Sequence, residues 1–392
     1  MTEEQRRLGE SGEVELRFWE PCTRKEDSVE WEYMPGRVEV QMACDKVYGV
    51  VEPFPQFTTL VKYILGGPDP LDFCNAYLSR DGTHWHYITM GFTNLRAKQH
   101  VPNRPGGWNG YGFELTLRLE RLPGEKTAPI WPFVMFQAIA KYVFGTGNVF
   151  EPNETCPMED YFRSKEIDTT LGGFMLMEDP EIEGYETERG RVRFIQMVGV
   201  TLEECKDAIR WNTEGFLKLV LEHYPLGVTY LHRGSICDDE EVKSKIRDGI
   251  AQDGSSLGVI TCQRPAFVKV NPDGDIFLQL SLVAVESLVD ALPYRIPYGR
   301  FLVLEDTEPG PFDGELVPSS LHCVSISEGA PTITVEKNEA SGKTMTKLSI
   351  TTELTHRIVD TLRPLTLGRL SWPELPQLEV EVIPSFGDRS SQ

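Results

Sequence analysis

The chain has 392 residues, 40% of them hydrophobic and 25% charged, and a formal net charge of −21 at pH 7. At about 150 residues per domain this length predicts two domains, and the apolar content suffices for folded cores, which excludes wholesale disorder. The negative charge opposes contact with phosphate backbones, so direct nucleic-acid binding is not expected. The first residues are acidic and polar, and no apolar run reaches about 18 residues, so we expect neither a signal peptide nor a membrane span.

The first half of the chain alternates between strand-like and helix-like patterns. Residues 1–36 form an acidic extension whose prolines interrupt any helix, and we expect this extension to be disordered. Residues 110–122 alternate apolar and polar side chains, which predicts a strand with one solvated face. Thr201 followed by Glu204 forms a capping box and predicts the start of a helix. Further strands are predicted over 84–92, 171–179 and 192–200, and helices over 57–65 and 132–144.

A Gly- and Ser-rich segment, residues 252–258, separates the two halves and marks the predicted domain boundary. We therefore expect an extension over 1–36, an N-terminal domain over 37–258 and a C-terminal domain over 259–392. The mixture of strands and helices predicts an α/β (α+β) fold with two mixed-sheet domains. In the second half, strands are predicted over 276–285, 300–304, 320–327, 333–336, 345–350 and 378–383, and a helix over 352–362.

His84 and His86 lie two residues apart in a predicted strand, so their rings point to the same face and could hold one metal ion. A zinc site needs a third ligand, and no nearby motif supplies one, so structural histidines are the favoured interpretation. The sequence has no Walker A, G-x-S-x-G or kinase signature, and we predict neither enzymatic activity nor a cofactor. The eight cysteines form no C-x-x-C pair, which is typical of a reducing compartment.

Residues 151–190 are strongly acidic, with 12 Asp and Glu residues against three Lys and Arg residues. Such a concentration of charge attracts and orients a cationic partner. Acidic loops also serve simply to keep a protein in solution, and charge alone leaves these two interpretations open.

Six segments carry a family resemblance. They are LVKYILGGPDPLDF (60–73), HWHYITMGFTNL (84–95), GYGFELTLRLER (110–121), FIQMVGV (194–200), IAQDGSSLGV (250–259) and SWPE (371–374). These segments resemble the Suppressor of fused family, the inhibitors of Gli/Ci zinc-finger transcription factors in Hedgehog signalling. The resemblance implies two α/β domains that close as a clamp on an extended segment of the transcription factor, which adds as a strand. The long insert that vertebrate and insect members carry is essentially missing here.

The resemblance also implies which residues contact the bound segment. In the N-terminal domain a groove tyrosine and acidic residues are expected to do so, and in the C-terminal domain an edge strand, an arginine and an aromatic residue. Tyr298 stands where the family has a histidine, which keeps an aromatic wall but loses a titratable donor. The expected contact residues are Tyr142, Glu154, Glu178, Asp179, Val259, Thr261, Arg295 and Tyr298.

The expected function is a negative regulator of Hedgehog/Smoothened signalling that sequesters a Gli/Ci-type transcription factor in the cytoplasm and restrains it in the nucleus. A Fused-type kinase is a second candidate partner, and we expect a monomer without contact to nucleic acid or membrane. Two alternatives stay open. One is a binding module of the same fold with a different protein partner, and the other is a metal-dependent enzyme centred on His84 and His86.

Overall fold

The structure is a computed structural model that describes residues 37–51, 53, 55–93, 110–165, 167–187, 190–262, 267–270, 275–309, 316–337 and 344–384. The predicted extension, residues 1–36, lies outside these residues. Contacts between Cα atoms divide the chain into two compact units. The first unit comprises Met1–Cys205 and Leu217–Ile236, and the second comprises Lys206–Phe216 and Cys237–Gln392.

This division differs from the boundary expected between residues 258 and 259, because residues 237–258 belong by their contacts to the second unit. Trp211 accounts for part of the difference. Its indole N–H donates to Asp253 over 2.9 Å, and its ring lies so close to Gly249 that a Cβ there would sit 2.3 Å away. Trp211 therefore holds the helix before the Gly- and Ser-rich segment within the second unit.

The first unit is built on one eight-stranded sheet with the order β1-β2-β3-β4-β8-β6-β5, and β7 pairs with β8. Every neighbouring pair is antiparallel except β4 and β8, which run parallel. The strands are β1 (Gln56–Thr58), β2 (Phe73–Leu78), β3 (His84–Met90), β4 (Phe113–Glu120), β5 (Thr155–Pro157), β6 (Leu171–Glu178), β7 (Tyr185–Thr187) and β8 (Gly190–Thr201). The helices along this part of the chain are α2 (Arg37–Tyr48), α3 (Trp131–Thr146), α4 (Glu159–Ser164), α5 (Leu202–Arg210) and α6 (Thr213–His223).

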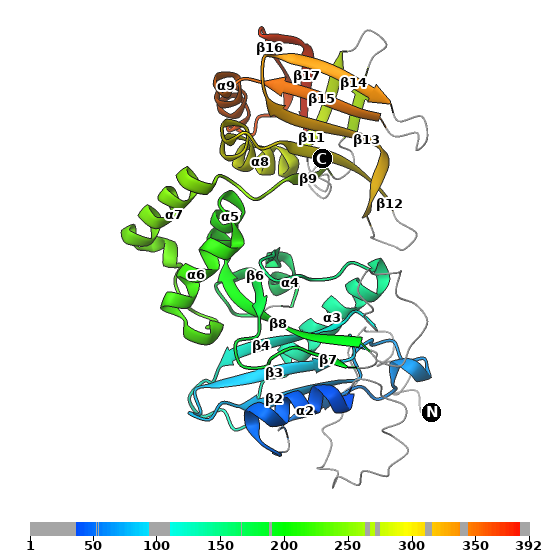
Figure 1. Ribbon diagram of the computed structural model, residues 1–392, viewed down its shortest axis with the longest axis vertical. Helices are drawn as coiled ribbons and strands as arrows, with labels where there is room; N and C mark the ends of the chain where they lie inside the picture. The colour runs from blue at the N-terminus through cyan, green and yellow to red at the C-terminus, as the bar shows by residue number, and fades with distance from the viewer. Residues whose placement is uncertain are drawn as a thin grey trace. The chain divides into compact units, whose positions relative to one another are not determined.

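Two helices cover opposite faces of this sheet (Figure 1). The apolar side of α3, including Phe133, Phe136 and Ala140, packs on alternate residues of the strands such as Leu115 and Leu117. On the other face, α2 packs on a smaller apolar cluster with Phe73, Ile88 and Phe194. Residues of opposite parity in one strand thus enter different cores, as the two-residue period of a strand requires.

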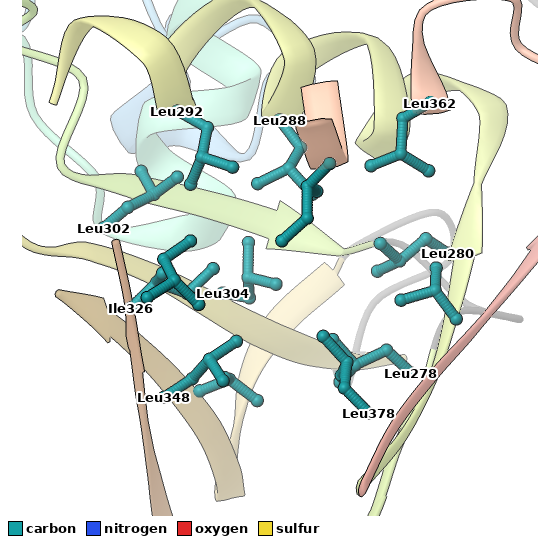
Figure 2. Packing of buried hydrophobic residues seen from close by; sticks show 14 of the residues in the cluster. Leu278, Leu280, Leu288, Leu292, Leu302, Leu304, Ile326, Leu348, Leu362 and Leu378 are labelled. Carbon is teal, nitrogen blue, oxygen red and sulfur yellow. The ribbon is translucent and has the colours of Figure 1, made fainter. Parts of the chain in front are cut away.

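The second unit contains a four-stranded sheet, β10-β11-β17-β16, and a five-stranded sheet, β14-β15-β13-β12-β9. Leucines and isoleucines of both sheets and of two helices form one core, in which Leu288 and Leu362 pack towards strand residues such as Leu304 (Figure 2). The strands are β9 (Val259–Cys262), β10 (Phe267–Val270), β11 (Ile276–Ser281), β12 (Leu302–Pro309), β13 (Leu316–Glu328), β14 (Thr332–Lys337), β15 (Thr344–Ile350), β16 (Gly368–Trp372) and β17 (Leu375–Ile383). The helices are α7 (Glu240–Asp253), α8 (Leu282–Ala291) and α9 (Thr352–Leu362).

The predicted mixed α/β fold is confirmed, and most predicted strands and helices occur with shifted ends. The helix predicted over 57–65 is wrong. Phe57 pairs with Cys74 in a strand, and only a 3₁₀ turn at Tyr63–Leu65 is helical, closed by Gly66 with φ of 87°. The strand predicted over 276–285 ends at Ser281, whose hydroxyl caps α8. Among the helices that the structure describes, none is long and apolar enough to cross a membrane.

The core of the second unit generates a stability prediction. Leu304 is 1% exposed, so Leu304→Ala leaves a cavity and should lower the free energy of unfolding by about 2 to 5 kcal/mol. Leu367 is 53% exposed, and the control Leu367→Ala should change the free energy of unfolding by less than about 0.5 kcal/mol. Urea denaturation measures both, and equal effects of the two substitutions would contradict this assignment of the core.

Candidate functional site

An apolar pocket of about 430 Å³ opens in the first unit beside α3. Its floor consists of sheet residues such as Leu115 and Leu176, and its walls come from α3 on one side and from the β5 region on the other. Such a volume and lining are typical of sites that bind apolar groups. The wall residues are Ala138, Ile139, Tyr142, Phe150, Cys156 and Met158.

A second hollow, also of about 430 Å³, has a more polar lining and shares Tyr142 and Phe150 with the apolar pocket. Glu154 and Asn148 line this polar hollow. The Tyr142 side chain is half exposed, and its hydroxyl accepts a hydrogen bond from the Asn148 amide over 2.7 Å. Asn148 and Phe150 are not among the residues expected from sequence. The one signal for them is Gly147, which ends α3 with φ of 75° and turns the chain back towards Tyr142.

Glu154 is held in place by the turn that precedes β5. Asn153 has φ of 67°, and its N–H donates to the Leu176 carbonyl over 2.7 Å. The Leu176 N–H in turn donates to the Glu154 carbonyl over 2.9 Å, and the Glu154 carboxylate accepts from the Glu151 N–H over 3.0 Å. Glu154 forms no ion pair with any described residue. Its carboxylate therefore carries a charge that a cationic group from outside the chain could neutralise.

Glu178 stands at the end of β6 and is already paired. The Arg193 guanidinium on β8 donates to Glu178 over 2.6 and 3.0 Å and to Glu151 over 2.5 Å. The Glu178 side chain is still 57% exposed. Arg193 thus offsets part of the charge that the acidic composition of residues 151–190 suggests, and it ties the turn before β5 to the centre of the sheet.

Asp179 does not line either hollow, so the structure lends no support to its expected contact with a partner, which stays a prediction. Its side chain is fully buried and accepts from both Arg118 terminal nitrogens over 3.0 Å and from Thr116 over 2.7 Å. The His86 ring and the N–H groups of Glu181 and Ile182 complete its shell. Successive residues of an extended chain face opposite sides, so Glu178 and Asp179 point apart.

His86 is a structural histidine. Its Nε2 lies 3.0 Å from Asp179, and its Nδ1 lies 2.5 Å from the Tyr48 hydroxyl of α2, a pattern that fits a neutral ring with the proton on Nε2. Burial, followed by the Arg118 charge, lowers the pKa of His86, and burial lowers that of His84 to about 4. Both ring nitrogens of His86 are in use, so this ring is not available as a metal ligand. The described residues contain no cluster of three or more His, Cys, Asp or Glu that could hold a metal ion.

The polar side of β4 is buried rather than solvated, which corrects the expectation for residues 110–122. Glu114, Thr116 and Arg118 are each at most 1% exposed, and they lie on the sheet face that α2 covers. The Glu114 carboxylate accepts from the Thr89 hydroxyl and from the N–H groups of Gly91 and Thr93. Burial nevertheless raises the pKa of Glu114 to about 7.

The remaining expected residues lie in the second unit. β9 is the last strand of its sheet and pairs in parallel with β12, where Val259 lies opposite Val303 and Thr261 opposite Glu305. Val259 is 44% exposed, whereas the Thr261 side chain lies outside the described part of the structure.

Arg295 and Tyr298 support the segment before β9. Arg295 is 7% exposed and donates to the carbonyls of Ser255 and Phe301 over 2.7 and 2.8 Å. Its expected contact with a partner stays a prediction that this burial does not support. Tyr298 is 37% exposed, and its side chain lies against Gly254, where a Cβ would sit 2.9 Å from the ring. The structure thus leaves Tyr142 and Glu154 together in one unit, and Val259 and Tyr298 accessible in the other.

The neutral state of His86 generates a pH prediction. Because its folded pKa lies below the ordinary 6.5, the stability it contributes is complete above pH 6.5 and is lost as the pH falls further. The folded pKa of Glu114 is raised from 4.5 to about 7, so protonation of Glu114 increases the stability of the folded state as the pH falls over the same range. Urea denaturation between pH 7.5 and 5.5 should therefore compare the wild type with His86→Gln, since Glu114 is common to both. Between pH 7.5 and 5.5 we expect the free energy of unfolding of the wild type to fall by on the order of 1 kcal/mol more than that of the variant. Equal pH dependence of the two free energies would contradict a neutral His86.

Residues 67–234 match the family model described as Suppressor of fused protein (SUFU). The human and mouse Suppressor of fused homologs are each 34% identical to the chain over 235 residues. This match covers 56% of the chain and 48% of each relative, so the chain spans about half the length of the curated relatives it matches. The family match contains α3, β5 and β6 and hence both hollows.

A solved structure shows the same fold over a longer part of the chain. The crystal structure of Drosophila Suppressor of Fused matches with a TM-score of 0.67 at 20% identity and covers 90% of this chain and 98% of that chain. At this identity the likeness concerns the fold alone. Residues 67–234 of the chain are therefore similar to the Suppressor of fused family.

Proposed function

We propose that this chain is a non-enzymatic negative regulator of Hedgehog/Smoothened signalling that binds a Gli/Ci-type zinc-finger transcription factor in the cytoplasm and the nucleus. One observation carries the proposal. The segment that matches the Suppressor of fused family contains a hollow in which an exposed tyrosine, Tyr142, adjoins a carboxylate without an ionic partner among the described residues, Glu154. This combination suits an extended segment that bears a cationic or imidazole group.

The proposed mechanism is strand addition. β5 and β9 each lie at the end of a sheet, and each carries or adjoins residues of the expected contact set. A segment that lies along β5 would gain affinity from backbone hydrogen bonds, while Tyr142 and Glu154 would select its side chains. Val259 on β9 would supply an apolar contact in the second unit, and engagement of both strands would make the chain a clamp.

A binding module of the same fold with a different protein partner is the alternative, because a fold does not by itself specify a partner. A Fused-type kinase is a further candidate partner of the proposed regulator, which we expect to act as a monomer. The structure lends no support to a metal-dependent enzyme at His86, because Tyr48 and Asp179 occupy both ring nitrogens.

The proposal predicts the effect of reversing one charge. A fluorescent peptide with the segment Ser-Tyr-Gly-His should bind with micromolar or tighter affinity, and added salt should weaken the binding because salt screens an exposed carboxylate. Glu154→Arg and Tyr142→Ala should each cost about 1 to 3 kcal/mol of binding free energy. Fluorescence polarisation at low and physiological salt measures these affinities.

The matched control is Glu183→Arg, which makes the same charge change at an exposed site. Glu183 follows Ile182, which packs in the cluster on the α2 face of the sheet, away from the hollow beside α3. Glu183→Arg should leave the affinity nearly unchanged. Unchanged binding by a folded Glu154→Arg protein would contradict the proposed site. Absence of binding by the folded wild type would favour the alternative partner, which an unbiased pull-down would then seek.

A further inference from the structure

The apolar pocket beside α3 has the properties of a small-molecule site that needs no protein partner. Its floor residues Leu115, Leu176 and Met197 are fully buried, and the half-exposed Tyr142 lines it at the protein surface. Water in such a pocket finds few partners for hydrogen bonds. An apolar ligand that displaces poorly ordered water gains affinity.

The volume of the pocket limits the size of the ligand. A cavity of about 150 Å³ in a protein core is enough to hold benzene. The pocket measures about 430 Å³, which is roughly three times that volume. A molecule of two or three fused rings would therefore fill it.

Sulfur atoms and aromatic rings line the walls of the pocket. The sulfur-containing side chains are those of Cys156, Met158 and Met197, and further rings come from Phe150 and Tyr161. Thioether sulfur and aromatic side chains both make favourable contacts with the π-system of an aromatic ring. An aromatic ligand would thus gain more in this pocket than a saturated ligand of the same size.

The groups beside the opening determine which polar group the ligand can carry. The Tyr142 hydroxyl accepts from Asn148 and, as a hydroxyl, can still donate its proton to an oxygen of the ligand. Tyr142 and Phe150 also line the polar hollow, which contains the Glu154 carboxylate. Because like charges repel, a ligand with an anionic end is disfavoured there.

We infer that the apolar pocket binds a small aromatic molecule of two or three fused rings, whose one polar group lies near the Tyr142 hydroxyl and is not anionic. This inference goes beyond the proposed function, and its test uses the full chain without any peptide. The bound molecule would contact Tyr142 and Phe150, the two residues that the pocket shares with the polar hollow.

The probe is 2-naphthol, which has two fused rings and one uncharged hydroxyl group. Met158 and Met197 line the pocket, whereas Met42 lies exposed on α2. In methyl NMR spectra of the chain labelled at methionine, 2-naphthol should shift the Met158 and Met197 signals and leave that of Met42. The titration should give a dissociation constant of about 0.1 mM or lower.

Two related molecules test the chemistry of the ligand in the same titration. Decahydro-2-naphthol, the saturated counterpart, should bind at least about threefold more weakly because it lacks the π-system. The anion 2-naphthoate should also bind more weakly, and Glu154→Gln should reduce this difference. Equal binding of the saturated molecule would contradict an aromatic ligand. Equal binding of 2-naphthoate would contradict the assignment of the polar group.

A substitution tests the place of binding. Ala138→Phe fills the pocket from α3 and should weaken 2-naphthol binding by about tenfold or more. The control Gly145→Phe adds the same side chain at an exposed position of α3, where no atom lies within 4 Å of the new Cβ, and it should leave the affinity unchanged. If Ala138→Phe does not fold, the wild-type titration decides the question alone.

The outcomes are independent of the peptide experiment. If 2-naphthol leaves the Met158 and Met197 signals in place, or if a folded Ala138→Phe protein binds it as well as the wild type does, the small-molecule site is wrong. Either result leaves the proposed function standing, because binding of Ser-Tyr-Gly-His is measured separately. Conversely, a chain that binds no peptide but shows the expected methyl shifts would retain the small-molecule site.

Discussion

The ion pair between Arg118 and Asp179 is the interaction on which the first unit depends. It joins the middle of β4 to the segment that follows β6, and both side chains are fully buried. Burying two charges is expensive unless their polar atoms find partners. Thr116, His86 and two backbone N–H groups complete the shell of the Asp179 carboxylate. The terminal nitrogens of Arg118 also donate to Glu181 and Gln196, whereas its Nε has no partner among the described residues. Because the end of β6 is held in this way, the strand that pairs with it, β5, and the turn that carries Glu154 have a defined position.

The same arrangement limits how acidic the candidate site really is. Asp179 points into the protein and Arg193 offsets Glu178, so two of the acidic residues expected to contact a partner are wholly or partly neutralised from within. In the proposed function, the attraction for a cationic partner would then depend mainly on Glu154, whose carboxylate has no ionic partner in the described structure. Exposed ion pairs contribute little on their own, so the proposed function would also need the backbone hydrogen bonds of strand addition.

The sequence predicts those parts of the fold that depend on local pattern. The strands over 84–92 and 192–200, the helix over 352–362 and the capping box at Thr201, whose hydroxyl accepts from the Glu204 N–H, all occur as predicted. A local pattern does not predict burial by elements that are distant in the sequence. The alternation in β4 predicts a half-solvated strand, because the residues near β4 in the sequence do not indicate that α2 covers its polar side. The same limit applies to the contact residues inferred from the resemblance, because Arg295 and Asp179 are buried and form hydrogen bonds within the chain.

Amide hydrogen–deuterium exchange with and without the Ser-Tyr-Gly-His peptide tests the central claim most directly. Strand addition predicts slower exchange over residues 153–158 and over the β9 residues Val259–Cys262 when the peptide is present, with no change in the α2 residues Arg37–Tyr48. Protection at β5 alone would confine the binding site to the first unit. Bound peptide without protection at either strand would contradict the account.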